Sequence, residues 1–460
     1  MGMKRTAFRE RKYKGRGFWS NPLQLLIAAA ILHLALTALI FGIGKQASMP
    51  ATFDANGTAV SFANDGVGYR QDAATLAEML SSRKFHEWSS AAYPFHVKLY
   101  SICFASLGSI LGFNILSAEP LNLFCYLGIL VFVYKLSHQI FGSVRAALIA
   151  AGVVALWPTF SLHTTQLLKD PLFIAGMLAL IFIMVQLLLR PGSWSMSLLR
   201  GALGALLAAG LFKERFDLAP LLIATVLLGG LMLLIRQFQL RRAWPANLAG
   251  IALLTILMVA ALLWLPVYRG ADHPRIEEAG SKPSNLKPKA RVSWWQVPAK
   301  IGIVRERFAE KYNNAGSNID SYVKLTSTAD LIRYLPRAVA IGLFAPFPNM
   351  WFETGSSVGL LGRILAGLET LIMYAIEFLA VVEVWRRRRN LSVWLLFSIA
   401  AAGITALGFV VVNVGTLYRL RYLYLILLII PAASAIEYFL DQFMKSRKSY
   451  PVSEPLVRST

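Results

Sequence analysis

The first apolar run of this 460-residue chain decides which folds are possible, and it reads PLQLLIAAAILHLALTALIFGIG over residues 22–44. A helix needs roughly 20 apolar residues to cross the hydrocarbon core of a bilayer. The run is also longer than the roughly 7–15 apolar residues of a cleavable signal peptide. We therefore expect it to remain in the protein as a signal anchor that spans the membrane.

Similar runs recur along the whole chain, which is 56% hydrophobic and only 15% charged. A soluble domain carries about 25% charged residues, so the sequence predicts an all-α polytopic membrane protein. We expect about ten transmembrane helices, within a range of roughly nine to twelve. The predicted spans are 22–44, 119–139, 144–161, 171–189, 198–211, 218–235, 248–268, 360–385, 391–412 and 420–440.

Two further apolar stretches, 95–111 and 335–351, carry polar or helix-breaking residues. The first contains His96 and Lys98, and the second contains Arg337 and two closely spaced prolines. We expect both to form interfacial helices that lie along the membrane surface.

Lys and Arg number 46 against 24 Asp and Glu, which gives a formal net charge of +22. Such an excess would suggest nucleic acid as a partner of a soluble protein, but the apolar runs exclude that class. Basic residues cluster before the first span and at alternate span ends, which places both termini in the cytoplasm by the positive-inside rule. We expect a bacterial inner (cytoplasmic) membrane protein with its functional site facing the periplasm.

This topology divides the chain into five parts. They are a basic tail (1–21), a transmembrane core (22–268) with a first outer loop (45–118), a large outer loop with an interfacial helix (269–359), the last spans (360–441), and a disordered cytoplasmic tail (442–460). The outer part over 269–334 looks irregular, and long loops of this kind are usually functional or disordered.

Acidic residues are scarce, so the few on the outer side are candidate functional groups. Asp170 precedes Pro171, an arrangement typical of a helix N-cap followed by proline at N1; it could equally direct a carboxylate into an outer cavity. Asp65 lies ahead of a predicted amphipathic helix, and Asp72 lies at its start. Each is a candidate base; the alternatives are that Asp65 is a turn residue and Asp72 a charge at the helix end.

Basic residues on the same side oppose the positive-inside bias and are candidate phosphate ligands. They are Lys213, Arg215, Arg419 and Arg421. Arginine can hold a phosphate through two hydrogen bonds, whereas lysine acts as a point charge. The alternative is that they only reach toward lipid headgroups from the span ends.

Several of these features occur in one order along the chain. An outer-loop Asp65 precedes Tyr69, a span ends in VYKLSHQIFG (133–142), the next reaches Trp157-Pro158, and Asp170-Pro171 opens the fourth. This arrangement resembles the GT-C superfamily of integral-membrane glycosyltransferases, in particular the branch of protein mannosyltransferases and lipid A aminoarabinose transferases. The resemblance is best over about residues 20–220.

The resemblance implies roles for individual residues. Asp65 would be the general base for an acceptor hydroxyl, and Asp170 would orient the acceptor or a divalent metal. Many members have adjacent acids in the first loop, whereas Asp65 is followed by Gly66; either Asp65 acts alone, or Asp72 takes the role, or the base is absent. Tyr69 and Lys169 are further site candidates.

The implied reaction is inverting sugar transfer at the outer membrane face. The donor would be a polyprenyl-phosphate sugar, whose phosphate would meet Lys213, Arg215, Arg419 and Arg421. Membrane lipids and a glycan, lipid or protein acceptor are the expected partners, as in cell-surface polysaccharide or glycoconjugate synthesis. No cofactor is certain, and a divalent metal remains possible.

Two other classes stay open. An O-antigen polymerase- or ligase-like enzyme would use a polyprenyl-diphosphate oligosaccharide, and the many basic residues of loop 269–334 favour it. A lipid or glycan transporter or flippase would place charges inside the spans, for which Glu377 and Glu383 are the main candidates.

Overall fold

The computed structural model describes residues 21–46, 63, 65–264, 297–311, 316–352 and 359–448. Within these ranges the regular structure is helical, apart from one isolated bridge between Asn318 and Asn413. The predictions for residues 1–20, 47–62, 64, 265–296, 312–315, 353–358 and 449–460 concern residues outside the described part of the chain. The predicted all-α class is confirmed.

Nine described helices are long and apolar enough to cross a membrane, or ten if one bent pair counts as a single span. They correspond one by one to nine of the ten predicted runs. The nine are α1 (Pro22–Lys45), α5 (Ile115–Phe141), α8 (Asp170–Leu189), α9 (Trp194–Glu214), α10 (Ala219–Leu240), α11 (Pro245–Trp264), α14 (Gly359–Arg386), α15 (Leu391–Val410) and α17 (Tyr422–Lys448).

The predicted span 144–161 is broken in the structure. Helix α6 (Val144–Ala155) and helix α7 (Pro158–Thr164) meet at an angle of 67°. Pro158 is the first residue of α7, and proline has no N–H with which to continue the preceding helix. The chain therefore turns at this point, and α7 leads toward the start of α8.

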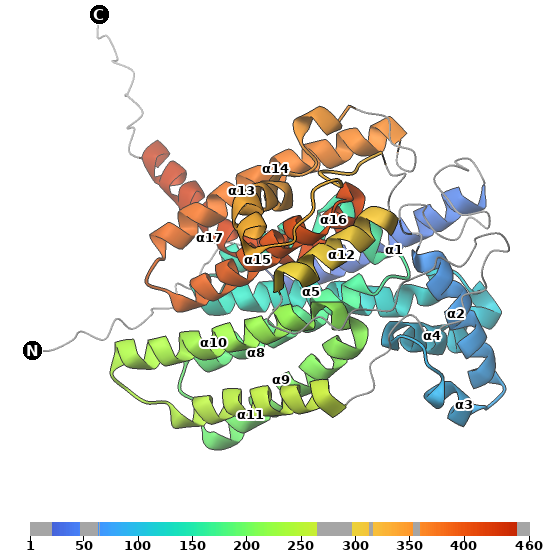
Figure 1. Cartoon of the computed structure of the whole chain (residues 1–460), viewed down its shortest axis with the longest axis horizontal. Helices are drawn as coiled ribbons and strands as arrows, with labels where there is room; N and C mark the ends of the chain where they lie inside the picture. The colour runs from blue at the N-terminus through green and yellow to red at the C-terminus, as the bar shows by residue number, and fades with distance from the viewer. Residues whose placement is uncertain are drawn as a thin grey trace, which may run out of the picture.

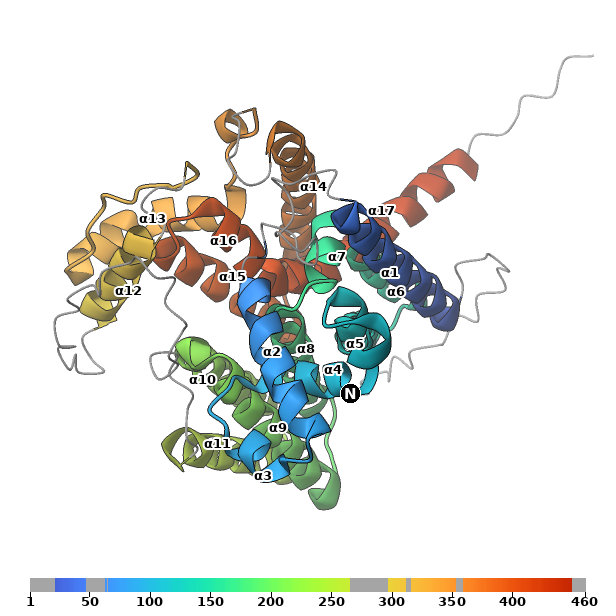
Figure 2. The same cartoon turned by 90° about the vertical axis from the view of Figure 1, so that its right-hand side faces the viewer.

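The described part of the first outer loop forms three helices: α2 (Asp65–Ser81), α3 (Phe85–Ser90) and α4 (Phe95–Leu111). The amphipathic helix thus begins at Asp65, several residues earlier than the sequence suggested. Its apolar side chains, among them Leu76, pack with α4 around Tyr100 and Phe104 in a second small core. Figures 1 and 2 show the three helices together at one end of the long helices.

The long helices form two groups beside α5 (Figure 1). Helices α8 to α11 make one group, in which α9 and α11 have the most extensive helix–helix contact. Helices α13 (Thr328–Phe344), α14, α15 and α17 make the other. Helix α15 contacts α8 and α10 and so joins the two groups. The first half of α17, residues 422–435, is buried behind it.

Part of the outer segment that looked irregular is ordered. Helix α12 spans Val297–Lys311, and it packs on α15. Its Arg305 is 2% exposed and donates hydrogen bonds to the carbonyls of Asp320, Val323 and Phe409. This buried arginine ties α12 and the following segment to the end of α15, which a search for hydrophobic runs could not detect.

Several other boundaries differ from prediction by a few residues, and helix α13 ends at Phe344 instead of 351. Two of the differences move residues of an expected loop or tail into a helix. Helix α13 begins at Thr328, within the expected loop, because Ser327 and Asp330 form a reciprocal capping box. Helix α17 continues to Lys448, so residues 442–448 belong to a helix and not to the tail.

Candidate functional site

Four of the predicted residues come together at the end of the bundle that carries α2. Nη2 of Arg419 donates a 2.8 Å hydrogen bond to Oδ2 of Asp65. Nε of the same arginine lies 3.3 Å from Oδ2 of Asp170 as an ion pair without hydrogen-bond alignment. Nη1 of Arg215 donates a 2.7 Å hydrogen bond to Oδ1 of Asp170. One arginine therefore bridges two carboxylates, and a second arginine holds the inner one.

Both aspartates are the first residues of helices. Asp65 is the first residue of α2, and Asp170 is the first residue of α8, with Lys169 at the N-cap. Of the two interpretations left open for Asp170, that of a helix N-cap is wrong, because Lys169 occupies the cap position and the Asp170 side chain binds arginine. Because the N-terminal turn of a helix favours negative charge, both positions stabilise an ionised carboxylate.

The two carboxylates differ in access. The Asp65 side chain is 38% exposed, whereas the Asp170 side chain is 7% exposed. Burial raises the pKa of Asp65, but the charge and hydrogen bond of Arg419, with the charges of Lys311 and Lys169, outweigh it and hold the pKa below its usual 3.8. Asp65 is therefore an ionised group within reach of solvent.

A narrow pocket of about 20 Å³ lies beside the inner carboxylate. Such a volume has room for about one water molecule. Asp170, Arg215 and Arg419 line its polar side, and the remaining lining is apolar or aromatic: Phe173, Ile174, Leu218, Leu407, Leu420, Leu423 and Tyr424. The pocket thus places two arginines beside apolar side chains from α8, α15, the α16–α17 segment and Leu218.

Further titratable groups surround Asp65. The rings of Tyr69 and His96 meet edge to face with centroids 4.3 Å apart. Nδ1 of His96 lies 2.5 Å from Oε1 of Glu214, and Oε2 of Glu214 accepts a hydrogen bond from the His96 backbone. Burial and the neighbouring charge of Asp65 raise the pKa of Tyr69. These contacts tie α2 and α4 to the end of α9, directly before Arg215.

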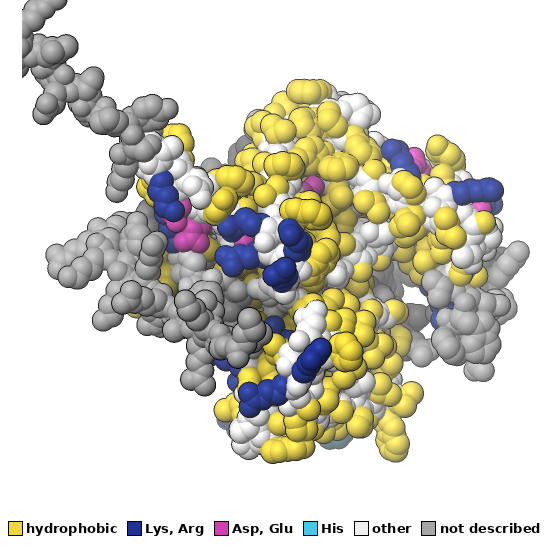
Figure 3. Space-filling model, turned by 90° about the vertical axis from the view of Figure 1, so that its left-hand side faces the viewer, with side chains coloured by type: hydrophobic (Ala, Val, Ile, Leu, Met, Phe, Trp, Pro, Cys, Tyr) yellow, Lys and Arg dark blue, Asp and Glu magenta, His cyan; other side chains and the backbone are white. Residues whose placement is uncertain are grey.

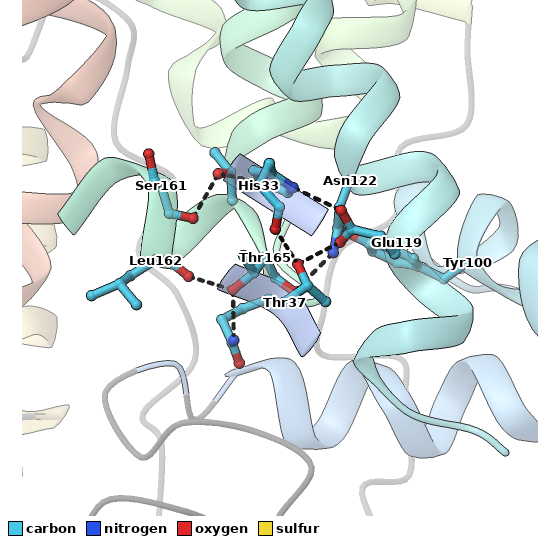
Figure 4. A network of polar contacts seen from close by, with 10 residues as sticks. His33, Thr37, Tyr100, Glu119, Asn122, Ser161, Leu162 and Thr165 are labelled. Atoms are coloured by element: carbon cyan, nitrogen blue, oxygen red, sulfur yellow. Dashed lines mark hydrogen bonds and ion pairs between the residues drawn. The ribbon is translucent and has the colours of Figure 1, made fainter. Parts of the chain in front are cut away.

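A buried polar network fixes the turn that leads to Asp170 (Figure 4). His33 of α1 lies 2.7 Å from Glu119 of α5 and 3.0 Å from the Thr164 hydroxyl. Asn122 of α5 donates to the carbonyl of Thr165 at 3.0 Å. The chain between α7 and α8 is therefore held against α1 and α5 by side chains inside the bundle.

A second buried carboxylate holds the segment that carries Arg419. Glu369 of α14 accepts hydrogen bonds from the Tyr418 hydroxyl at 2.6 Å, from the Trp157 ring nitrogen at 3.2 Å and from the Thr159 backbone at 2.9 Å. Tyr418 and Arg419 belong to the short helix α16 (Val414–Leu420). Glu369 thus joins α16 to the α6–α7 break.

The other predicted residues lie apart from the pair of carboxylates. Arg421 is 1% exposed and donates to the carbonyls of Leu343 and Ala345 at the end of α13. Lys213 is exposed, and its charge acts on Lys98 of α4. Asp72 lies two turns further along α2, where its charge acts on Tyr93.

The residues present fit an arginine-bridged pair better than a metal pair. The Arg419 guanidinium contacts both Asp65 and Asp170, so a cation between them would have to displace it. In the part of the chain that the structure describes, no three His, Cys, Asp or Glu side chains form a cluster that could hold a metal ion.

Sequence analysis missed Glu119, Glu214 and Glu369 as contributors to this region. Each is buried, and each lies within a candidate span. The available signal was their charge: acidic residues within transmembrane segments are rare and mark functional or structural polar networks.

No family model matches this chain, and no curated protein matches it. Similar solved structures include the Archaeoglobus fulgidus oligosaccharyltransferase in the apo form, with a TM-score of 0.49, 14% identity, and coverage of 94% of this chain and 52% of the other. Another is AglB from the same organism in complex with an inhibitory peptide and a dolichol-phosphate, with a TM-score of 0.48, 14% identity, and coverage of 95% and 52%. The chain spans about half the length of these structures.

Proposed function

We propose that this protein is an inverting glycosyltransferase of the GT-C type. It transfers a sugar from a polyprenyl-phosphate donor to a glycan, lipid or protein acceptor at the outer face of the membrane, in cell-surface polysaccharide or glycoconjugate synthesis. The observation that carries the proposal is the contact of Arg419 with both Asp65 and Asp170 beside an apolar pocket.

The donor would bind with its phosphate at Arg215 and Arg419. Guanidinium groups match phosphate geometry and form strong charge-assisted hydrogen bonds. The apolar wall at Leu407, Leu420 and Leu423 would receive the first part of the prenyl chain. Because the pocket has room for about one water molecule, these side chains would move apart when the donor enters.

The acceptor would bind at Asp65, the more exposed carboxylate. Asp65 accepts the proton of the acceptor hydroxyl as its oxygen forms a bond to the anomeric carbon. The bond from that carbon to the phosphate oxygen breaks, and the polyprenyl phosphate leaves with the bonding electrons. Arg215 and Arg419 stabilise the developing negative charge on it. Attack opposite the leaving group inverts the anomeric configuration.

In this scheme Asp170 is a positioning residue. It is nearly buried and bound to both arginines, so it fixes their guanidinium groups for the phosphate. The same location keeps Asp170 away from a bulky acceptor. The scheme thus assigns different tasks to two chemically identical side chains by their exposure and partners.

Substitution of the three aspartates tests these assignments. We expect Asp65→Asn to lower transfer from a polyprenyl-phosphate sugar by at least roughly 100-fold, the usual contribution of a general base. Asp170→Asn should also lower the rate, whereas Asp72→Asn should retain it. All three should insert in the membrane at wild-type levels. Wild-type turnover by the Asp65 and Asp170 variants, or loss only in the Asp72 variant, would contradict the site.

The donor distinguishes the neighbouring classes. Purified protein in liposomes should consume a polyprenyl monophosphate sugar and form a glycosylated product. Consumption of only a diphosphate-linked oligosaccharide would instead indicate a polymerase- or ligase-like enzyme. Movement of a lipid-linked glycan across the bilayer without any product would indicate a flippase.

A further inference from the structure

A second pocket lies at the opposite ends of α8 and α15 from the carboxylate pair. Its volume is about 560 Å³, within the range of small-molecule sites. Its lining residues are Leu189, Arg236, Arg386, Arg387, Arg388, Arg389 and Asn390. We call this the arginine pocket. Figure 3 shows Lys and Arg side chains gathered on this face of the molecule.

The arginine pocket has a strong excess of positive charge, since five arginines line it. Arg386 and Arg387 are partly neutralised by the buried Glu383, with Nε of Arg386 at 2.6 Å and Nε of Arg387 at 3.3 Å from its oxygens. Arg388 and Arg389 are exposed, and neither forms an ion pair with a described acidic side chain. The pocket therefore has arginines left to bind an external anion.

The two helix groups contribute to the arginine pocket from opposite sides. Leu189 comes from α8 and Arg236 from α10, whereas the other four arginines come from the end of α14 and the turn into α15. Arg236 donates to the carbonyl of Leu189 at 3.3 Å, and its buried Nε has no hydrogen-bond partner among the described residues. An anion here would contact both groups at once.

The location indicates which anion is available. Leu189 ends α8, Arg386 ends α14, and Asn390 caps the start of α15, all of which are candidate spans. The arginine pocket therefore lies where helices leave the hydrocarbon core, at the depth of lipid headgroups. The distribution of basic residues assigns this face to the cytoplasm, whose leaflet supplies anionic lipids.

We propose that the arginine pocket binds the phosphate headgroup of an anionic phospholipid, which bridges the α8–α11 group and the α13–α17 group. Guanidinium groups bind phosphate diesters by charge and paired hydrogen bonds. The two acyl chains would lie in the adjoining leaflet, outside the pocket. This site is separate from the proposed donor site, and neither depends on the other.

Native mass spectrometry of the full-length protein tests the site. The protein is released from nanodiscs that contain equal amounts of phosphatidylglycerol and phosphatidylcholine, and the retained lipids are counted. We expect wild type to retain phosphatidylglycerol selectively. Arg388→Gln with Arg389→Gln should weaken its retention roughly tenfold to thirtyfold, from the typical contribution of a basic residue near a membrane surface.

The matched control is Arg241→Gln with Arg242→Gln, which removes the same charge from exposed positions just after α10 that do not line the pocket. It should retain phosphatidylglycerol like wild type. Equal loss in both double variants, or no selectivity in wild type, would overturn the proposal. Wild-type melting temperatures of both variants in lipid-free detergent would show that folding is intact.

A soluble arm identifies the source of the phosphate. Inorganic diphosphate or glycerol phosphate at millimolar concentration should displace little phosphatidylglycerol, because neither is held at the membrane. Tight binding of either to detergent-solubilised wild type, with displacement of the lipid, would overturn the assignment to a lipid headgroup.

Discussion

Arg419 contacts carboxylates from two different helices, Asp65 on α2 and Asp170 on α8. It belongs to α16, a helix of seven residues that Glu369 holds through the neighbouring Tyr418. A movement of this short helix would change the surroundings of both carboxylates together. Arg419 is thus the residue through which donor binding and base activation would be coupled.

Replacement of Arg419 by Gln should move the acid limb of the pH–rate profile to higher pH. In the wild type Arg419 holds the pKa of Asp65 below 3.8, so this proposed base stays ionised as the pH falls toward that value. Without Arg419, burial of the carboxyl, the largest influence on it, raises its pKa. The base is then protonated, and activity lost, at a higher pH.

The measurement is kcat/KM for sugar transfer between about pH 4 and 8, which reports the base of the free enzyme. Arg421→Gln is the comparison, since Arg421 binds carbonyls at the end of α13 and does not contact Asp65. An unchanged acid limb in Arg419→Gln, or an equal shift in both variants, would contradict the role of Arg419.

Sequence reasoning predicted that Asp65, Asp170, Arg215 and Arg419 lie on one side, because topology alone assigns span ends to faces. It could not separate Arg419 from Arg421. The turn between α16 and α17 places these neighbours on different sides of the chain, and no periodic pattern reveals such a turn. The sequence likewise could not show that Asp170 is more deeply buried than Asp65.

At the scale of helices, the contact between α9 and α11 depends on small residues. A Cβ added to Gly201 would lie 2.3 Å from the Gly250 carbonyl oxygen, and one added to Gly250 would lie 2.4 Å from that of Ser197. Without side chains at these positions the two backbones approach closely, as is common between membrane helices. This contact sets the position of α9 and hence of Arg215 after it.

Gly201→Ala should therefore destabilise the protein by roughly 1–3 kcal/mol, the usual cost of overpacking. Gly210→Ala on the same helix is the matched control, because nothing lies within 4 Å of its added Cβ. The control should be neutral or stabilise by up to about 1 kcal/mol through helix propensity. Denaturation in detergent gives both values, and equal effects would contradict the close contact.

The elements were largely predictable because each span is a long apolar run, and helix α4 has the predicted bounds Phe95–Leu111. The differences arose where tertiary contacts decide. The break between α6 and α7 is held by Glu369 from α14, and α12 is held by the buried Arg305. Neither contact has a local sequence pattern.

At the scale of the whole molecule, the carboxylate pair and the arginine pocket occupy opposite ends of α8 and α15. The positive-inside rule predicts that the arginine pocket faces the cytoplasm and that the carboxylates face the outer side. Both lie where the two helix groups meet. A ligand at either membrane face would therefore contact the boundary between the two helix groups.

Cysteine labelling tests this orientation. In a background with Cys103 and Cys125 replaced by Ala, an impermeant maleimide should label Glu78→Cys on α2 in intact spheroplasts. It should label Arg242→Cys, after α10, only once the membrane is permeabilised. Both positions are exposed, so the membrane and not burial would decide access. The reverse pattern would contradict the topology.

The most direct test of the proposed function is an experimental structure with bound polyprenyl phosphate. The phosphate oxygens should lie within about 3.2 Å of guanidinium nitrogens of both Arg215 and Arg419. The prenyl chain should pass Leu407, Leu420 and Leu423. A phosphate bound away from both arginines would contradict the proposed site.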